Sequence, residues 1–385
     1  MAIAFWAIIF LLIYPYLVYP VLLVILAAIC GKKHAVDDNY TPAVTLIIPA
    51  HNEEDCIADK IKNALALDYP REKLQILIGS DGSKDRTNEI VSSFKEPNIL
   101  FMPFETQSGK MSVINKCVPR ATGEIIVLTD ANAMFEPGTI KALIRHFADP
   151  EIGCVSGAKV IAGKTAATAS GEGIYWKLES FLKKTETLTG SCSGADGAVY
   201  AVRKFLYSYP RDTTVIMDDF AVSLGVIKQG YRCVYEPAAR AFESSGMLLR
   251  EEFRRKARIL AGALTAFFDY FFALWLYDME MTFKLVSHKV IRWMGFPLMM
   301  AALVLNYYLL GIRTEGGLPV YDVLFKCQLA VYGLVMIGWA LEALRIRIKP
   351  LFLLFYFVMT NLAQVYGVWQ YMNRPRTGAW EKLKR

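Results

Sequence analysis

The chain has 385 residues, of which 54% are hydrophobic and 21% are charged, and its formal net charge at pH 7 is +7. A mean hydropathy of +0.30 is too high for an ordinary cytosolic protein, so we expect apolar and charged residues to be segregated along the chain. The seven cysteines form no CxxC pair and no zinc-ligand spacing with the four histidines, which predicts reduced thiols rather than a zinc site. No basic stretch with interleaved aromatic residues stands out, so nucleic acid is not an expected partner.

Four apolar segments predict a multi-pass protein of the cell (plasma) membrane. Residues 1–31 carry no charge and exceed the roughly 20 residues needed to cross a bilayer. They lack a basic start and a small-residue cleavage site, so we interpret them as a retained N-terminal anchor. Three further segments predict a C-terminal membrane region over residues 291–373; they lie at 293–312, about 323–344 and 350–372.

Basic residues beside these segments predict the orientation of the domain between them. The flanking cations are Lys32, Lys33, His34, Lys289, Arg292, Arg345, Arg347 and Lys349. Because such residues favour the cytoplasmic side, we expect residues 40–245 to form a cytoplasmic domain. The basic tail at 374–385 conflicts with a fourth crossing. The sequence leaves open whether the last segment is re-entrant or the rule fails there.

Strand-like and helical patterns alternate from residue 43 onward. Apolar runs predict strands at 43–50, 74–80, 99–103 and 124–129. Between them, helical patterns occur at Ile57, Ile61 and Leu65, from about Asp85, and near Lys110. This order predicts an α/β fold with an open parallel sheet wrapped by helices. Ligands of such sheets bind beyond the carboxyl ends of the strands.

Polar residues collect at those strand ends. Asp130 and Asn132 follow the last predicted strand, and they stand two residues apart, so both side chains can face one object. Residues 51–54 and 80–85 follow the first two strands. Helix capping explains each turn taken singly, but three acidic strand ends together repel unless a cation or donor groups offset them. No G-x-G-x-x-G turn follows a strand, which excludes a dinucleotide fingerprint.

Seven motifs then occur in an order that resembles the membrane-embedded family 2 glycosyltransferases, a group that includes synthases of cellulose, hyaluronan and poly-N-acetylglucosamine. The motifs are IIPAHNEEDCI, GSDGSKDRT, GKMSVIN, GEIIVLTDANA, SGADGAVYAVRK, MDDFAVSLGVIKQGYRCVYEP and FRRKARILAG. The resemblance covers about residues 43–262. It implies a GT-A-like fold and a nucleotide-diphospho-sugar donor, such as a UDP-sugar.

The resemblance also implies a donor site. The residues that match the family's donor-binding positions are Glu53, Asp81, Lys110, Asn115, Asp130 and Arg255. Asp130 and Asn132 match the D-x-D element, which implies Mg²⁺ or Mn²⁺ held together with the diphosphate. A role for Asn132 as a helix cap stays open beside this one.

Catalysis is implied at Asp218 and Asp219. Asp219 matches the general base that removes the proton of the acceptor hydroxyl, and a single displacement would invert the anomeric centre. Adjacent acids at a helix start also simply match the helix dipole. In the last motif Arg258 matches the family's Q-x-x-R-W arginine, whereas Arg255 and Ile259 replace its Gln and Trp. That departure puts processive polymerisation in doubt.

The acceptor side and the membrane surface complete the prediction. Gly194, Ala195 and Asp196 match the acceptor-side loop, where small residues allow a sugar close to the backbone. Residues 246–290 predict amphipathic helices at the bilayer interface. The expected partners are therefore a nucleotide-sugar, a glycan or lipid-linked acceptor and the lipid bilayer. A polyprenyl-phosphate sugar transferase and a non-catalytic membrane scaffold stay open as alternatives, and so does the oligomeric state.

Overall fold

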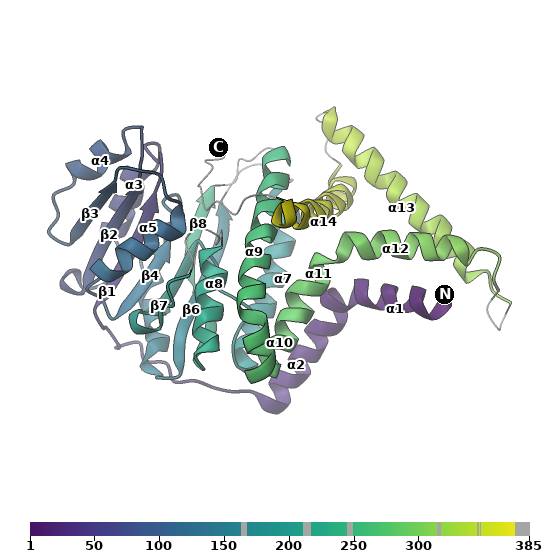
Figure 1. The fold of residues 1–385 in the computed structure, drawn as a ribbon, viewed down its shortest axis with the longest axis horizontal. Helices are drawn as coiled ribbons and strands as arrows, with labels where there is room; N and C mark the ends of the chain where they lie inside the picture. Colours follow the sequence, from purple (N-terminus) through teal and green to yellow (C-terminus); the bar gives the residue numbers. More distant parts are fainter. Residues whose placement is uncertain are drawn as a thin grey trace.

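The computed structural model describes residues 1–162, 168–210, 217–244, 249–313, 317–344, 346 and 348–373. The predicted basic tail at 374–385 and the flanking Arg345 and Arg347 lie outside these ranges. An α/β body forms one end of the molecule, and the N-terminal helices and the last helices gather at the other end (Figure 1).

One half of the sheet is parallel, as the alternating pattern predicts. Its strands run in the order β3-β2-β1-β4, with the four strands parallel to one another. Every residue of β1 is buried, because helices cover both faces of this half. The strands are β1 (Val44–Ala50), β2 (Leu74–Asp81), β3 (Ile99–Phe104) and β4 (Ile125–Thr129), and the helices between them are α3 (Ile57–Leu65), α4 (Thr87–Ser93) and α5 (Lys110–Cys117).

The other half makes the sheet mixed, and the expectation of a parallel sheet is wrong there. β7 pairs antiparallel with both β4 and β6, while β6 and β8 are parallel and β5 is an antiparallel edge. The prediction rested on residues 43–129 alone, which contain only the parallel half. The strands are β5 (Met134–Phe135), β6 (Ile152–Ala162), β7 (Val199–Arg203) and β8 (Arg232–Ser244).

Two apolar cores lie on opposite faces of this sheet. One contains Ile114 of α5, Val222 of α8 and Phe267 of α9, and the other contains Ile61 of α3 and Leu143 of α6. The helices that follow β5 are α6 (Thr139–Ile144), α7 (Thr168–Thr189), α8 (Asp218–Lys228) and α9 (Leu249–Tyr277). Short 3₁₀ turns lie at Arg71–Lys73, Val118–Arg120, Arg145–Ala148 and Lys204–Leu206.

Four described helical segments are long and apolar enough to cross a membrane: Ala2–Cys30, Leu249–Tyr277, Val320–Ala343 and Lys349–Asn373. The first comprises α1 (Ala2–Ile13), the π-helical turn η1 (Tyr14–Val18) and α2 (Tyr19–Cys30). The last two, α13 and α14, confirm two of the predicted C-terminal segments. α9 was expected at the interface, yet it forms one 29-residue helix of spanning length.

The segment expected at 293–312 is not a straight span. α10 (Met279–Leu285), η6 (Val286–Val290) and α11 (Ile291–Trp293) meet α12 (Gly295–Tyr308) at a bend of 63°. Pro297 lies in the first turn of α12 and has no N–H to donate to the preceding turn. The helix therefore restarts at the bend, and the two halves together form at most one broken span.

Candidate functional site

A cavity of about 730 Å³ lies between the strand ends and the helices α7, α9, η6, α11 and α14. Most of the residues predicted from the sequence line it: Glu53, Lys110, Asp130, Asn132, Ala195, Asp196, Asp218, Asp219, Arg255 and Arg258. They come from six separate stretches of the chain. Asp81, Asn115 and Gly194 are predicted site residues that do not line this cavity.

Lys110 joins two carboxylates at the centre of the site. Its Nζ lies 2.7 Å from Asp130 Oδ1 and 2.8 Å from Asp218 Oδ1. Burial alone would lower the pKa of Lys110, but the two carboxylates outweigh it and hold that pKa above its ordinary value. Tyr200 donates a hydrogen bond of 2.9 Å to the second oxygen of Asp218. The end of β4, the start of α5 and the start of α8 are thereby fixed together.

Asp219 lies beside this arrangement with a perturbed acidity. Burial, followed by the charge of Asp218, raises the pKa of Asp219 to about 7, although Lys110 opposes the shift. The backbone N–H of Phe220 donates to Oδ1 at 2.8 Å. A Cβ on Gly197 would lie 3.2 Å from the other oxygen, so the glycine leaves room for the carboxylate. A carboxylate with a pKa near 7 is suited to accept a proton at neutral pH.

Lys60 supports the Asp130 turn, and the sequence reasoning missed it. Its side chain is fully buried on α3, and Nζ donates to Thr129 Oγ1 at 3.1 Å and to the carbonyl of Ala133. Burial lowers the pKa of Lys60 to about 7, with Asp130 opposing the shift. Lys60 follows Ile57 by three residues, which places it on the apolar face of α3. A lysine on the apolar face of a helix was the sequence signal that its side chain is buried.

Asp81 holds a loop instead of lining the cavity. It is fully buried, and its two oxygens accept the backbone N–H groups of Ser108 at 2.7 Å and Gly109 at 2.8 Å. These residues immediately precede Lys110 at the start of α5. Asp81 therefore acts on the position of Lys110, which the sequence reasoning did not anticipate.

The other two residues off the cavity wall have structural contacts. Asn115 donates to the carbonyl of Pro210 at 2.9 Å and accepts from the Tyr207 hydroxyl at 2.9 Å. Gly194 has a φ of +123°, and a Cβ there would lie 2.8 Å from the Phe220 ring. Conformation and close packing account for this glycine. Its neighbours Ala195 and Asp196 are the loop residues that reach the cavity.

The first turns of α9 supply Arg255 and Arg258 to the wall. Arg255 makes two hydrogen bonds to Glu252, at 2.8 and 3.0 Å, and the Tyr356 hydroxyl of α14 lies 3.3 Å from the same carboxylate. Ile259, which replaces the expected tryptophan, also lines the cavity. α14 therefore packs against the segment that resembles the family's last motif.

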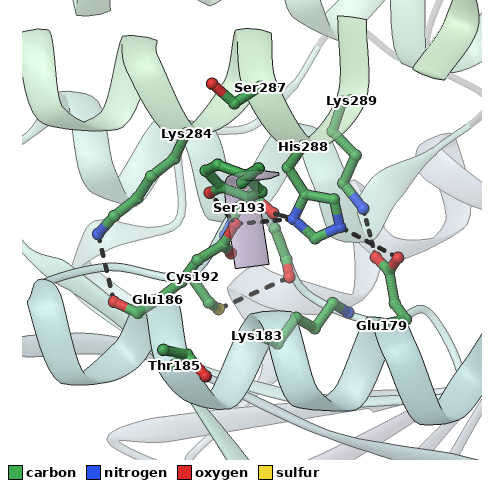
Figure 2. Close-up of polar contacts among 12 residues, drawn as sticks. Glu179, Lys183, Thr185, Glu186, Cys192, Ser193, Lys284, Ser287, His288 and Lys289 are labelled. Carbon is green, nitrogen blue, oxygen red and sulfur yellow. Dashed lines mark hydrogen bonds and ion pairs between the residues drawn. The ribbon is translucent and has the colours of Figure 1, made fainter. Parts of the chain in front are cut away.

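A buried ion cluster joins α7 to the segment that carries His288 and Lys289 (Figure 2), and several of its residues line the cavity. His288 is fully buried, and its Nε2 lies 3.1 Å from Glu179 while its Nδ1 lies 2.7 Å from both Glu186 and Ser193 Oγ. Both ring nitrogens of His288 therefore lie within hydrogen-bond distance of a carboxylate. Although burial opposes it, the contact with His288 is the main reason that the pKa of Glu186 is lowered to about 2.

The same cluster changes the interpretation of two basic residues. Lys289 and Arg292 were used above as flanking charges that orient the membrane segments. Both instead contact Glu179, with Arg292 at 3.1 Å, and both line the cavity. Their charges therefore balance a buried carboxylate of α7. Two of the three groups of basic residues that predicted the orientation of the domain therefore remain.

The residues present fit a divalent ion that is shared with a ligand. Asp130 and Asn132 provide a carboxylate and a carboxamide oxygen on the cavity wall, which are donors that Mg²⁺ and Mn²⁺ accept. Within the described ranges, no group of three His, Cys, Asp or Glu side chains could hold a metal by itself. The remaining coordination would have to come from phosphate oxygens and water.

The sequence of the chain is similar to those of known glycosyltransferases. Residues 45–208 match the family model "Glycosyl transferase family 2". The chain is 30% identical over 233 residues to a poly-β-1,6-N-acetyl-D-glucosamine synthase of Staphylococcus aureus, and 27% identical over 201 residues to one of Staphylococcus epidermidis. These alignments cover 58% and 51% of this chain, and 56% and 48% of the relatives, so the chain spans about half their length.

One solved structure shares nearly the whole fold. A mannosyltransferase from Pyrobaculum calidifontis, solved in complex with GDP-mannose and Mn²⁺, superposes with a TM-score of 0.71 and covers 96% of this chain and 98% of its own. Its sequence is 20% identical. The likeness establishes a GT-A-like fold with apolar helices at both ends of the chain, as predicted.

Proposed function

Because the chain belongs to glycosyl transferase family 2, we propose that it is a membrane-bound, inverting enzyme that transfers a sugar from a nucleotide diphosphate to a polysaccharide or lipid-linked acceptor. The observation that carries this proposal is the single cavity into which Asp130, Asp218 and Asp219 converge around Lys110. A non-catalytic scaffold would have no need for a buried carboxylate with a pKa near 7 in that cavity.

The chemistry assigned to these residues is a single displacement. Asp219 accepts the proton of an acceptor hydroxyl while the hydroxyl oxygen bonds to the anomeric carbon of the donor. The bond between that carbon and the diphosphate oxygen breaks at the same time, and its electron pair leaves with the nucleoside diphosphate. Attack from the opposite face inverts the anomeric centre. Lys110 and Arg258 are the cations placed to offset the charge of the departing group.

The metal fits this scheme as a co-ligand of the donor. Asp130 and Asn132 would hold Mg²⁺ or Mn²⁺ with the diphosphate, and the ion would supply positive charge at the leaving group. The structural relative was solved with Mn²⁺ and a nucleotide-sugar. Arg255 and Glu53, which line the same cavity, complete the proposed donor site.

The names of the relatives select the donors to be tried first. The curated relatives are named for N-acetylglucosamine polymers, and the structural relative was solved with GDP-mannose. We therefore propose UDP-N-acetylglucosamine as the first donor and GDP-mannose as the second. The catalytic domain is proposed to face the cytoplasm of a cell membrane, as the basic residues Lys32 and Lys33 after the first segment indicate.

The test uses the full chain purified into lipid nanodiscs. Release of nucleoside diphosphate is followed with each nucleotide-sugar in Mg²⁺ or Mn²⁺. Asp219→Asn should bind the donor but lose at least about a hundredfold in turnover, which is typical of a missing general base. The matched control is Asp59→Asn, because Asp59 is an exposed acid of α3. Turnover by Asp219→Asn at the wild-type rate would overturn the assignment.

A further inference from the structure

Lys183 is a buried cation that the proposed chemistry does not use. It lies on α7, is 4% exposed and lines the cavity. Within the part of the chain that the structure describes, its ammonium makes no hydrogen bond and no ion pair, and the centroid of the Tyr235 ring lies 5.8 Å from Nζ. An ammonium has three donor hydrogens, and leaving them without acceptors in a buried place is costly.

The other cations on the same wall differ from Lys183. Lys289 and Arg292 contact Glu179, Lys110 contacts Asp130 and Asp218, and Lys159 contacts Glu243. Glu179 is thus already shared among several donors. Among the acids near Lys183, Asp196 has the largest effect on its pKa. The charges of Asp196 and Glu179 together outweigh burial and keep the pKa of Lys183 above its ordinary value.

The Asp196 carboxylate can accept a further hydrogen bond. It is 8% exposed and lines the cavity, and its Oδ1 accepts one backbone N–H, that of Ala198, at 3.2 Å. Its other oxygen accepts no hydrogen bond from any described residue. A buried donor and a buried acceptor thus line the same cavity and make no hydrogen bond to each other. A hydroxyl group, which both accepts and donates, matches that pair.

The chain holds this pair in place before any ligand arrives. Glu186, one turn along α7 from Lys183, accepts the backbone N–H of Ser193 at 2.8 Å. His288 contacts both Glu186 and the Ser193 hydroxyl, and Figure 2 draws Lys183, Glu186, Ser193 and His288 in this one cluster. The loop that continues to Asp196 is therefore fixed relative to the helix that carries Lys183, which favours binding by a preformed site.

The charge of the surroundings selects the kind of ligand. Asp219 and Asp196 lie near this part of the cavity, whereas the charge of Glu179 is already balanced by Lys289 and Arg292. A lipid phosphate would bring further negative charge against them, whereas sugar hydroxyls are neutral. Gly197 follows Asp196 directly and lies against the Asp219 carboxylate, so a sugar bound here is next to the proposed base.

We propose that Lys183 and Asp196 form an acceptor subsite that binds hydroxyl groups of a saccharide beside Asp219. This inference rests on the proposed function, because it names the acceptor class of that same cavity. Lys183 then fixes the orientation of the acceptor sugar, and the lipid phosphate of a polyprenyl carrier is not its ligand.

The test measures acceptor and donor binding separately on the full chain in nanodiscs. The acceptor probes are N-acetylglucosamine and mannose oligosaccharides of two to six units, and undecaprenyl phosphate is the lipid probe. Binding to Lys183→Met, Lys183→Arg and Lys184→Met is compared with wild type. Lys184→Met is the matched control, because Lys184 is the exposed neighbour on the same helix.

Lys183→Met should weaken saccharide binding about ten- to a hundredfold. Lys183→Arg should recover part of the affinity, and Lys184→Met should match wild type. When water is the acceptor, the KM for the nucleotide-sugar should be unchanged in all three variants. An unchanged KM also shows that the variants fold. The inference is overturned if no saccharide binds wild type, if Lys183→Met binds saccharide normally, or if it loses only undecaprenyl phosphate. Loss of the proposed function would instead appear as wild-type protein that neither binds nor hydrolyses any nucleotide-sugar.

Discussion

At the scale of single residues, the environment of Asp219, the proposed general base, should set the pH below which the proposed reaction slows. The pKa of this carboxyl is raised to about 7 by burial and by the charge of Asp218. Below that pH the base is protonated and cannot accept the acceptor's proton. The physical cause is local, because the two acids are adjacent in sequence at the start of one helix.

We predict an acidic limb in the pH profile of the wild-type enzyme. The value of kcat/KM for the donor should fall about tenfold per pH unit below an apparent pKa near 7, because this parameter reports the free enzyme. Initial rates from pH 5 to 9 provide the measurement. A profile that is flat from pH 5 to 7 would count against Asp219 as the base.

The sign of the shift can be tested at Asp218. Asp218→Asn removes the neighbouring negative charge, so the pKa of Asp219 should fall and the acidic limb should move to lower pH by about one unit. The maximal rate should also fall, because Lys110 loses one of its two partners. An unmoved limb in this variant would mean that burial alone sets the pKa.

The sequence predicted which acids share one cavity better than it predicted the buried lysines around them. Asp130, Asp218 and Asp219 stand in motifs with a family order, and all three line the cavity. Lys60 and Lys183 stand in ordinary helical patterns, where a lysine usually faces solvent. Their burial depends on what packs over the helix, and one sequence contains no direct record of that.

At the scale of elements, the loop before α5 links a strand end to the site. Asp81 at the end of β2 accepts the N–H groups of Ser108 and Gly109, and Lys110 begins the helix that follows. The prediction that Asp81 contacts the donor stays untested. The structure gives it a contact of a different kind, through the backbone that carries Lys110.

Asp81→Asn tests this link. A carboxamide can accept from only one of the two N–H groups, which leaves the other buried donor unsatisfied at a cost of about 1–3 kcal/mol of unfolding free energy. The thermal midpoint should fall, and the donor KM should rise because Lys110 is displaced. Asp68→Asn is the control, since Asp68 is exposed. A wild-type donor KM together with a lowered midpoint would limit Asp81 to stability.

The ion cluster on α7 joins elements far apart in the chain. Glu179 contacts His288, Lys289 and Arg292 of η6 and α11. Glu179→Gln would leave several buried cations with one carboxylate fewer, and breaking a buried pair from one side costs about 3 kcal/mol. We expect a clear loss of thermal stability in detergent, whereas Glu72→Gln in an exposed turn should have no effect. Equal midpoints would contradict the structural role.

The elements themselves were predicted unevenly, for a physical reason. Continuous apolar runs marked β1, β2 and β4, because strands buried on both faces need such runs. The antiparallel half was not assigned from sequence. α9 was predicted as part of a set of interfacial helices, because its first turns are rich in Arg and Glu while its second half is apolar; the structure forms one continuous helix there, and its place at the interface stays a prediction. The helix packs its length against α8 and α14, which no local pattern reveals.

At the scale of the whole molecule, the number of crossings depends on α9 and on the bent pair that follows it. α9 has the length of a span, but 44% of its most apolar window is buried inside the protein, against 11% for α13. Its buried residues, among them Ala266 and Phe267, belong to the core of the α/β body. We infer that α9 stays with the catalytic domain and that the bent pair makes the next crossing.

Cysteine labelling in whole cells tests this topology. The two exposed cysteines, Cys30 and Cys327, are first replaced by serine, and one reporter, Lys95→Cys or Arg313→Cys, is then introduced. A membrane-impermeant maleimide should reach Arg313→Cys in intact cells but Lys95→Cys only after permeabilisation. An odd number of crossings must lie between the two positions for that result. Labelling of both on the same side would mean that α9 crosses as well or that the bent pair is re-entrant, and it would place the end of α12 beside the catalytic domain.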